Sequence, residues 1–473
     1  MSSYPRQTQL IESITDSSID KLRLHIRELD IIVAASAWRD LARQLKHWLS
    51  IILRPALSAK VAIAGTSRKT TPDEAEEFSI SFGMALSELG LTEFYDLLPG
   101  AKRTVETVVN DWVRAQWLML SRLQRDRSRL SAILAGRPGK RVQHVTPELS
   151  DPHDRGQTVT VLQFGNGSRV VYKPRPCEGE RIWFSVLQWL NERGFEPSFH
   201  LPKLISRRNY CWMSFVGHRG CISSRGVKRF YFRWGAQAAI AQLLGCADLH
   251  RQNWIASGQH PVLVDAEMLG DAFAADGGES DAVTRLHPVL RTGLLPLIET
   301  DGVGRYNGIA PFDCSAHRKE RNVFWPVYRG RVERPEKYID EIADGFSAAS
   351  RFICASPNRK LFERFVRQAA SRTNLRVLRR ATAQYRQLLD ASLHPRYLQN
   401  RGDRLRYLLE SCGRTQAGRI EANALLRCSI PRFEISRRVC ERRSALVPTL
   451  RTMINSTNLL AARLLIPRSR RPA

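Results

Sequence analysis

The sequence predicts an α+β protein, with a β-rich core between two mainly helical regions. Apolar residues recur at three- and four-residue intervals near both ends of the chain, which is typical of helices. Short β-rich segments separated by glycine turns fill the middle. The chain has 473 residues, 43% of them hydrophobic and 25% charged, so it is long and apolar enough to bury a substantial core.

We expect three regions along the chain. The first is helical, with breaks at Pro55 and at Pro99-Gly100, and the GRPG run at 136–139 follows it. A two-lobed core comes next, and a mainly helical part completes it. The helical region is expected at 1–140. The core is expected at 141–335, with a small lobe at about 141–220 and a catalytic lobe at about 221–335. The C-terminal part is expected at 336–473, with a disordered basic tail at 467–473.

A β-hairpin opens the core. The segments TVTVLQF and SRVVYKP have the composition of strands, and the GNG between them is a turn signal. Lys173 ends the second strand. A lysine on an early strand that contacts the phosphates of ATP is a required part of kinases, whereas elsewhere such a lysine is simply an exposed strand end.

The stretch DLHRQNWIASGQHPVLVDAE, from Asp248 to Glu267, carries the polar residues that a phosphotransferase needs. An apolar, helix-like run leads into it, and a turn at 258–261 separates two short strands. Kinases use one aspartate to accept a hydroxyl proton, here Asp248. An asparagine and a second aspartate hold Mg²⁺ against the nucleotide phosphates, here Asn253 and Asp265. The alternative is a solvated loop followed by a strand.

Two later segments bear on this site. The stretch GDAFAADGGESDA at 270–282 is polar and rich in glycine, so we expect a mobile loop there. The segment LRVLRRAT at 375–382 fits a short strand better than a helix. In a strand, one face would carry Arg376, Leu378, Arg380 and Thr382.

The chain is strongly basic. It contains 73 Lys and Arg against 46 Asp and Glu, which gives a net charge of +27 and a pI of about 10.4. Such a charge attracts polyanions, acidic peptides, nucleotides or anionic membranes, unless the arginines are merely dispersed. No helix-turn-helix, zinc or RNP-type pattern occurs, so we do not expect nucleic-acid binding.

Cysteine usage and hydropathy indicate a cytoplasmic protein. Nine cysteines occur without a C-x-x-C pair or a Cys/His cluster, which argues against a zinc site and a disulfide framework and fits a reducing cytosol. The N-terminus lacks the apolar core of a signal peptide, and no run of about 18 apolar residues predicts a membrane span.

Seven separated blocks carry a family resemblance. They are SDPHDRG (150–156), VVYKPRP (170–176), DLHRQN (248–253), VLVDAE (262–267), VLRTGLLP (289–296), RVLRRATAQYRQLL with SLHP (376–395) and SIPRF (429–433). In this order they resemble the dehydratase half of class II lanthipeptide synthetases, the LanM type of lantibiotic biosynthesis. The resemblance covers most of residues 105–450 and implies a lipid-kinase-like bilobal core that uses ATP and Mg²⁺. It implies phosphorylation of Ser and Thr in a ribosomal precursor peptide with an acidic leader, followed by loss of phosphate to leave dehydroalanine or dehydrobutyrine.

The resemblance assigns kinase roles to one set of residues. Lys173 resembles the lysine that contacts the nucleotide phosphates and also takes part in elimination. Asp248 and His250 resemble the reacting part of the catalytic loop. The positions matching the Mg²⁺ ligands are Asn253, Asp265 and Glu267.

A second set matches positions implicated in elimination: Asp151, His153, Arg376 and Thr382. His153 would transfer a proton and Arg376 would bind the departing phosphate. Taken alone, Asp151 before Pro152 is an ordinary turn former, and Arg376 is one of many arginines. Glu421 matches a family acid upstream of the SIPRF block.

The sequence also departs from the family pattern. Ser214 stands where a glutamate is usual, and Cys428-Ser429 replaces a usual Gly-Asp pair. No zinc set of two cysteines and a histidine follows the dehydratase part, so we expect no cyclase activity in this chain. It is either a free-standing dehydratase, which would need a separate cyclase partner, or a truncated gene product. The alternatives are a kinase-like phosphotransferase without elimination, and a degenerate, non-catalytic family member that binds the peptide.

Overall fold

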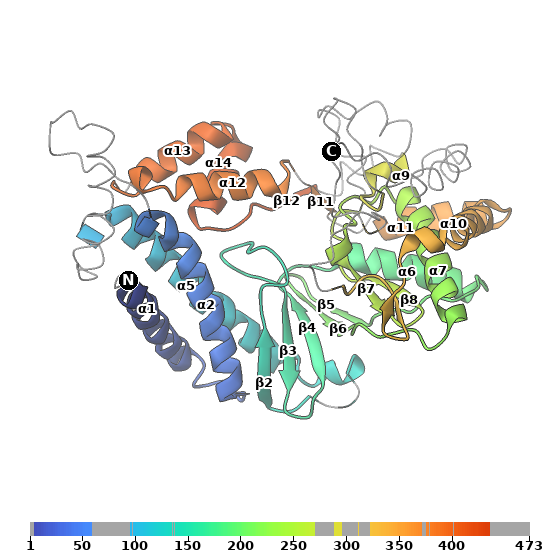
Figure 1. The fold of residues 1–473 in the computed structure, drawn as a ribbon, viewed down its shortest axis with the longest axis horizontal. Coiled ribbons are helices and arrows are strands. Elements are labelled where there is room, and N and C mark those ends of the chain that lie inside the picture. The colour runs from blue at the N-terminus through green and yellow to red at the C-terminus, as the bar shows by residue number, and fades with distance from the viewer. Residues whose placement is uncertain are drawn as a thin grey trace. The chain divides into compact units, whose positions relative to one another are not determined.

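The computed structural model confirms the predicted α+β class (Figure 1). Chain contacts divide it into two compact units. The first comprises Met1–Pro176, Arg207–Ser214 and Arg379–Arg432, and the second comprises Cys177–Ser206, Phe215–Leu378 and Phe433–Ala473. The structure describes residues 4–58, 95–96, 98–134, 136, 138–269, 288–295, 311, 322–370, 375–377, 379–400 and 402–435. Within these ranges, no helix has both the length and the apolar character needed to cross a membrane.

Some of the predictions fall outside the described residues. These are the mobile loop at 270–282, the helices expected after residue 435 and the basic tail at 467–473.

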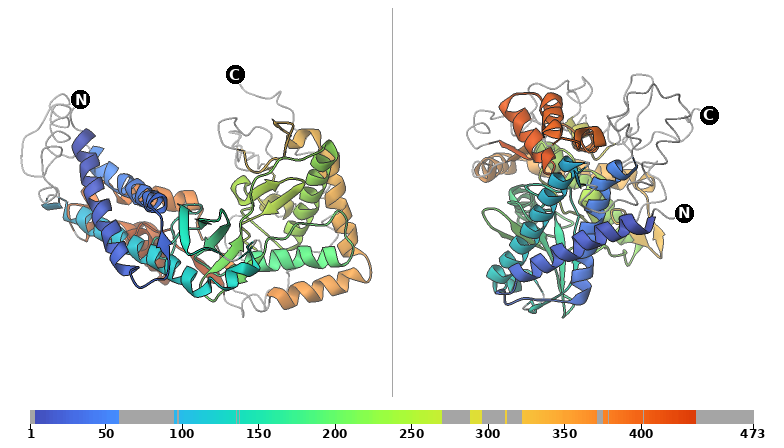
Figure 2. Two further views of the ribbon diagram at one scale, coloured as in Figure 1. Left: turned by 90° about the horizontal axis from the view of Figure 1, so that it is seen from below. Right: turned by 90° about the vertical axis from the view of Figure 1, so that its left-hand side faces the viewer.

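Three long helices form one part of the first unit (Figure 2): α1 (Tyr4–His25), α2 (Ala35–Ser58) and α5 (Pro99–Asp126). In α2 the leucines at 41, 45 and 49 are fully buried at four-residue spacing, as an amphipathic helix requires. Pro99 stands at the start of α5, so that predicted break is confirmed. The break predicted at Pro55 is wrong, because α2 continues to Ser58 while Ile52 and Leu53 stay buried.

The sheet of the first unit has strands side by side in the order β1-β2-β3-β4-β6. The predicted hairpin around GNG is confirmed, because β3 and β4 pair antiparallel with Thr160 opposite Tyr172. The two-residue β1 pairs in parallel with β2, and it was not predicted because so short a strand has no periodicity. The strands are β1 (Ile32–Val33), β2 (Arg141–Thr146), β3 (Thr160–Phe164), β4 (Arg169–Lys173) and β6 (Cys211–Ser214).

A buried carboxylate ties α5 to this sheet. Asp126 is completely buried and accepts hydrogen bonds from Arg207 Nη2 at 2.6 Å, Tyr210 Oη at 2.8 Å and Trp212 Nε1 at 3.0 Å. Burial opposes ionisation, but these hydrogen bonds prevail and lower the pKa of Asp126 below its usual value. Trp212 lies opposite Tyr172 on β4, so the anchor also supports the strand that ends in Lys173.

The rest of the first unit is a small helical cluster with its own apolar core. The core contains Tyr385, Leu408, Cys412, Ala422, Leu425 and Ile430. The elements are α12 (Thr382–Ser392), η5 (Pro395–Tyr397), α13 (Asp403–Cys412) and α14 (Gln416–Leu426). The short helix η1 (Arg129–Ala132) instead follows α5 directly in the chain.

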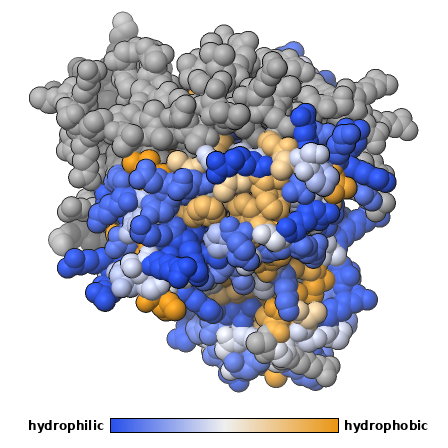
Figure 3. Space-filling model, turned by 90° about the vertical axis from the view of Figure 1, so that its right-hand side faces the viewer, coloured by the Kyte–Doolittle hydropathy of each residue, from blue (hydrophilic) through white to orange (hydrophobic). Residues whose placement is uncertain are grey.

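The second unit is built around α7, which is buried on nearly all sides and packs against α10. The predicted hairpin after Asp248 is confirmed, with β7 and β8 antiparallel. On the face shown in Figure 3 the described side chains are mostly hydrophilic, with apolar areas between them. The elements are α6 (Glu178–Glu192), β5 (Leu204–Ser206), α7 (Ser224–Leu243), η2 (Arg251–Asn253), β7 (Trp254–Ser257), β8 (His260–Leu263), α9 (Pro288–Arg291), β9 (Val327–Tyr328), β10 (Arg331–Val332), η4 (Pro335–Lys337), α10 (Ile339–Cys354), α11 (Asn358–Ala370), β11 (Leu375–Val377) and β12 (Phe433–Ile435).

The strand prediction for 375–382 is only partly right. The strand β11 covers Leu375–Val377 and pairs with β12, so Arg376 does lie on a strand. Thr382, however, is the first residue of α12. The predicted shared face of Arg376 and Thr382 is therefore wrong, because the extended backbone does not continue to Thr382.

Two glycines allow α7 and α10 to cross closely. A Cβ on Gly235 would lie 1.9 Å from the main-chain oxygen of Ile342, and a Cβ on Gly345 would lie 1.9 Å from that of Phe232. No real side chain tolerates such a distance, and main-chain atoms within a helix cannot move aside cheaply. Glycine is therefore required at both positions.

We predict that Gly235→Ala lowers the free energy of unfolding by about 3 kcal/mol, because it forces the two helices apart. Urea unfolding followed by tryptophan fluorescence measures this loss. Gly217→Ala is the matched control, because its Cβ would meet only the Phe215 ring at an ordinary 3.4 Å. Equal stability of the two variants would contradict the close crossing.

Candidate functional site

The loop after α7 holds Asp248 in an unusual backbone conformation. Its φ is +59°, in the left-handed region that few residues other than glycine adopt. The neighbouring amides fix it in place: Ala247 donates to the Met268 carbonyl at 2.9 Å, and Leu249 donates to the Thr292 carbonyl at 2.8 Å. Such strained conformations concentrate at functional sites.

The glycine of the VLRTGLLP block, Gly293, is required by the backbone next to Asp248. It has a φ of +78°, and a Cβ there would lie 3.3 Å from the Leu249 amide nitrogen and 3.7 Å from Asp248 Cα. A larger residue would therefore press on the backbone that presents Asp248.

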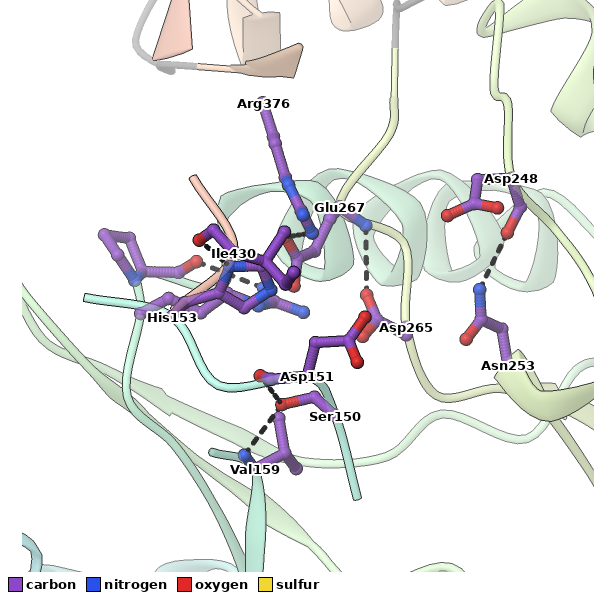
Figure 4. A network of polar contacts seen from close by, with 12 residues as sticks. Ser150, Asp151, His153, Val159, Asp248, Asn253, Asp265, Glu267, Arg376 and Ile430 are labelled. Atoms are coloured by element: carbon purple, nitrogen blue, oxygen red, sulfur yellow. Dashed lines mark hydrogen bonds and ion pairs between the residues drawn. The ribbon is translucent and has the colours of Figure 1, made fainter. Parts of the chain in front are cut away.

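Asn253 is oriented by the same loop. Its Nδ2 donates to the Asp248 carbonyl at 2.7 Å (Figure 4). Its own carbonyl accepts from the Val264 amide at 2.8 Å. Because the amide nitrogen faces Asp248, the Oδ1 atom is turned away from that carbonyl. An amide oxygen is the kind of ligand that Mg²⁺ binds.

Two carboxylates follow β8 (Figure 4). The Glu267 amide donates to Asp265 Oδ1 at 3.2 Å, and Glu267 Oε2 accepts from Arg376 Nη1 at 2.6 Å. The Glu267 and Arg376 side chains are only 9% and 11% exposed, so this is a largely desolvated ion pair. Gly179 allows the backbone between these two carboxylates to pass close to α6, since a Cβ at Gly179 would lie 2.0 Å from the Ala266 oxygen.

These groups are close enough to change the ionisation of Asp248. Burial raises the pKa of Asp248, and the carboxylates of Asp265 and Glu267 raise it further, against the opposing effects of His250 and Arg376. His250 Nε2 lies 3.8 Å from Asp248 Oδ1. A carboxylate with a raised pKa is a better proton acceptor than an ordinary aspartate.

The residues present suit Mg²⁺ bound together with phosphates. Among the described residues, no three His, Cys, Asp or Glu side chains are grouped to hold a metal by themselves. Mg²⁺ usually takes one or two protein ligands and completes its shell with water and substrate phosphates. Asn253 Oδ1 and Asp265 would be such a pair of ligands, whereas the Glu267 carboxylate is engaged by the ion pair with Arg376.

Four of the predicted residues belong to the first unit. Lys173 ends β4 opposite Cys211 and is only 2% exposed, so the alternative of an exposed strand end is wrong. Asp151 Oδ1 accepts from Arg386 Nη2 at 2.5 Å. Thr382 lies four residues before Arg386 on α12, so both side chains are on one face of that helix. His153 Nδ1 lies 2.8 Å from the Ile430 carbonyl (Figure 4).

The structure therefore groups the predicted residues in two sets, and we describe each within its own unit. The second unit brings together Asp248, His250, Asn253, Asp265, Glu267 and Arg376. The first unit contains Lys173, Asp151, His153 and Thr382; Arg386 donates to Asp151 and lies on the same face of α12 as Thr382.

Two further residues were not singled out in the sequence. Glu180 on α6 is completely buried, which is unusual for a carboxylate. In protein kinases a glutamate on the helix after the lysine strand forms an ion pair with that lysine. The glutamates of the helix predicted after Lys173 could therefore have been named as candidates from the sequence. For Arg386 no signal existed, because it is one of 73 basic residues.

Glu421 has a structural role in the first unit. It is 1% exposed and accepts from Tyr385 Oη at 2.7 Å and Arg380 Nε at 3.2 Å, with Arg379 3.7 Å away. These contacts anchor the start of α12, the helix that carries Thr382.

The family model described as "Domain of unknown function (DUF4135)" matches residues 99–322 and 310–436, more than half of the chain. The chain belongs to the DUF4135 family. All ten predicted site residues of this DUF4135 protein lie inside the matched ranges.

The chain is also similar to part of a longer protein from Lactococcus lactis. It is similar to the lacticin 481/lactococcin biosynthesis protein LcnDR2 of Lactococcus lactis subsp. lactis, with 23% identity over 275 residues. The match covers 50% of this chain and 30% of the relative. The relation is therefore distant and concerns only part of the longer protein.

We predict that Asp248→Asn lowers any phosphoryl transfer by about 10²–10⁴-fold, the usual contribution of a general base. The melting temperature should not fall, because asparagine tolerates a left-handed backbone and the change removes a carboxylate next to two others. Phosphopeptide or ADP production and thermal unfolding measure the two effects. Asp344→Asn, at an exposed position on α10, should change neither.

Proposed function

We propose that this protein is a lanthipeptide-type dehydratase with a lipid-kinase-like core. It phosphorylates Ser and Thr of a precursor peptide with ATP and then eliminates the phosphate. The observation that carries the proposal is the cluster in the second unit, where Asp248, Asn253 and Asp265 lie around one hairpin and Arg376 joins them from a distant strand. The similarity to a lacticin biosynthesis protein supports the same function.

In the first step, Asp248 accepts the proton of the substrate hydroxyl while that oxygen attacks the γ-phosphorus and ADP leaves. His250, 3.8 Å away, stabilises the ionised form of Asp248. Asn253 and Asp265 would hold Mg²⁺, which would neutralise charge on the nucleotide phosphates. In this proposal Lys173 binds the nucleotide phosphates.

In the second step, a base removes the proton on Cα of the phosphorylated residue. The C–H electron pair forms the Cα=Cβ bond, and the Cβ–O bond breaks as inorganic phosphate leaves. Arg376 is suited to bind that phosphate, because Glu267 holds its Nη1 and its buried Nε has no hydrogen-bond partner among the described residues. His153 transfers the proton, and Asp151 and Thr382 support this step.

The proposed substrate is a precursor peptide with an acidic leader, which suits a chain with a net charge of +27. In this proposal ring closure on the dehydrated peptide is left to a cyclase.

The direct test is incubation with ATP, Mg²⁺ and a Ser- and Thr-containing precursor peptide encoded near the gene, followed by mass spectrometry. Dehydration lowers the peptide mass by one water per modified residue. A stable gain of one phosphoryl group would instead indicate a kinase without elimination. If the peptide mass stays unchanged and calorimetry shows no binding of ATP with Mg²⁺, the proposal is wrong.

We predict that Arg376→Ala slows elimination by about 10²-fold or more, the usual loss when one charge-stabilising group is removed, so that phosphorylated peptide accumulates. The ratio of phosphorylated to dehydrated peptide measures this change. Arg359→Ala on α11 is the matched control, since Arg359 also pairs with a glutamate but is 56% exposed. Recovery of only unmodified peptide from Arg376→Ala would contradict the role given to Arg376.

A further inference from the structure

A short segment after α14 runs along the loop that carries Asp151 and His153. The Ile430 amide donates to the Pro152 carbonyl at 2.7 Å, and His153 Nδ1 lies 2.8 Å from the Ile430 carbonyl. One residue earlier, Ser429 Oγ accepts from the Gly156 amide at 3.0 Å. Three hydrogen bonds thus join residues 429–430 to residues 152–156, more than 270 positions apart in the chain.

The contact with Ile430 determines the tautomer of His153. A carbonyl oxygen can only accept a hydrogen bond, so Nδ1 must carry the hydrogen and donate it. In the neutral ring the basic lone pair is then on Nε2. The position of the Ile430 carbonyl therefore decides which atom of His153 can accept a proton.

The hydrogen bond between Ser429 and Gly156 is buried. Ser429 is 1% exposed, and its hydroxyl accepts from an amide that is itself buried in the loop. Gly156 has a φ of +73° and is confined by Trp48, whose ring would lie 3.2 Å from a Cβ at this position. Without the hydroxyl, the Gly156 amide would lose its acceptor, and an unsatisfied buried amide drives local rearrangement.

Arg404 holds the other end of the segment. This arginine is 3% exposed, and its guanidinium donates to the last carbonyls of α14, Leu425 at 2.9 Å and Leu426 at 3.1 Å. Its Nη1 also donates to Thr104 Oγ1 of α5 at 3.0 Å, and its Nη2 lies 3.4 Å from Cys428 Sγ. A cation at a helix C-terminus is favoured by the helix dipole, so Arg404 fixes the direction in which the chain leaves α14.

An ion pair also holds the end of α14. Arg427, which follows α14, donates to both carboxylate oxygens of Asp111 on α5, at 2.8 and 2.5 Å. Asp111 is only 4% exposed. The segment that meets His153 therefore starts from a helix end bound to α5 by two arginines.

We propose that Ser429 and Arg404 are positioning residues for His153, and that they make Nε2 the atom that takes up the Cα proton during elimination. The idea rests on the proposed function. As Nε2 gains this proton, the C–H pair forms the double bond and the phosphate leaves with the Cβ–O electrons. Ser429 also accounts for one departure from the family pattern, because its hydroxyl supplies an acceptor for Gly156 at that position.

The test isolates elimination by supplying a synthetic phosphoserine peptide with an acidic leader, together with ADP and Mg²⁺. Ser429→Ala should slow elimination by about 10–100-fold, as small displacements of reacting groups do, with phosphorylation of unmodified peptide within about twofold of the wild type. Ser429→Thr keeps the hydroxyl and should restore elimination. Ser18→Ala, which removes a buried hydroxyl from α1, is the control and should have no effect.

A second measurement does not depend on activity. In protein labelled with ¹⁵N-histidine, the NMR signals lost in His153→Gln identify His153. They should show a hydrogen on Nδ1 in the wild type and a mixture of tautomers in Ser429→Ala and in Arg404→Gln. An unchanged tautomer and an unchanged elimination rate in Ser429→Ala would overturn the inference. If the wild type eliminates nothing while the tautomer still depends on Ser429, the proposed function fails and the positioning role stands.

Discussion

The electrostatic balance around Asp248 is the constraint on which the second unit depends. Burial raises the pKa of Asp248, and the nearby carboxylates of Asp265 and Glu267 raise it further. Like charges in a partly buried site repel, so the cluster needs fixed counterparts. Arg376 neutralises Glu267 in a desolvated pair, and the Glu267 amide donates to Asp265. In the proposed function Asp248 accepts a proton and Asp265 holds a cation, and these two roles need carboxylates in different surroundings.

Buried polar anchors play a similar part in the first unit. Asp126, Glu421 and Arg404 are each 3% exposed or less, and each is satisfied by several hydrogen bonds. These anchors support the elements that present the predicted residues: the strand of Lys173, the helix of Thr382 and the loop of His153. A satisfied buried network favours one arrangement over others, because breaking it leaves charges without partners.

Buried arginines also reduce the positive charge that is available at the surface. Several arginines that contribute to the net charge of +27 are internal supports, among them Arg404 and Arg233. Arg233 is 4% exposed and donates to the carbonyls of Ser198 and Gln259, and burial lowers its pKa to about 10. Such residues cannot bind a polyanion, so the charge available to an acidic partner is smaller than the composition indicates.

The sequence by itself determined the α+β class, the two hairpins and the identity of the residues around Asp248. Those features are local: alternating apolar residues, turn glycines and short motif spacings decide them within about ten positions. Tertiary structure alone decided that β11 stops at Val377, that Arg376 reaches Glu267, and that Ile430 sets the tautomer of His153. Each depends on contacts between residues more than 50 positions apart, and no local pattern encodes which of 73 basic side chains meets which partner.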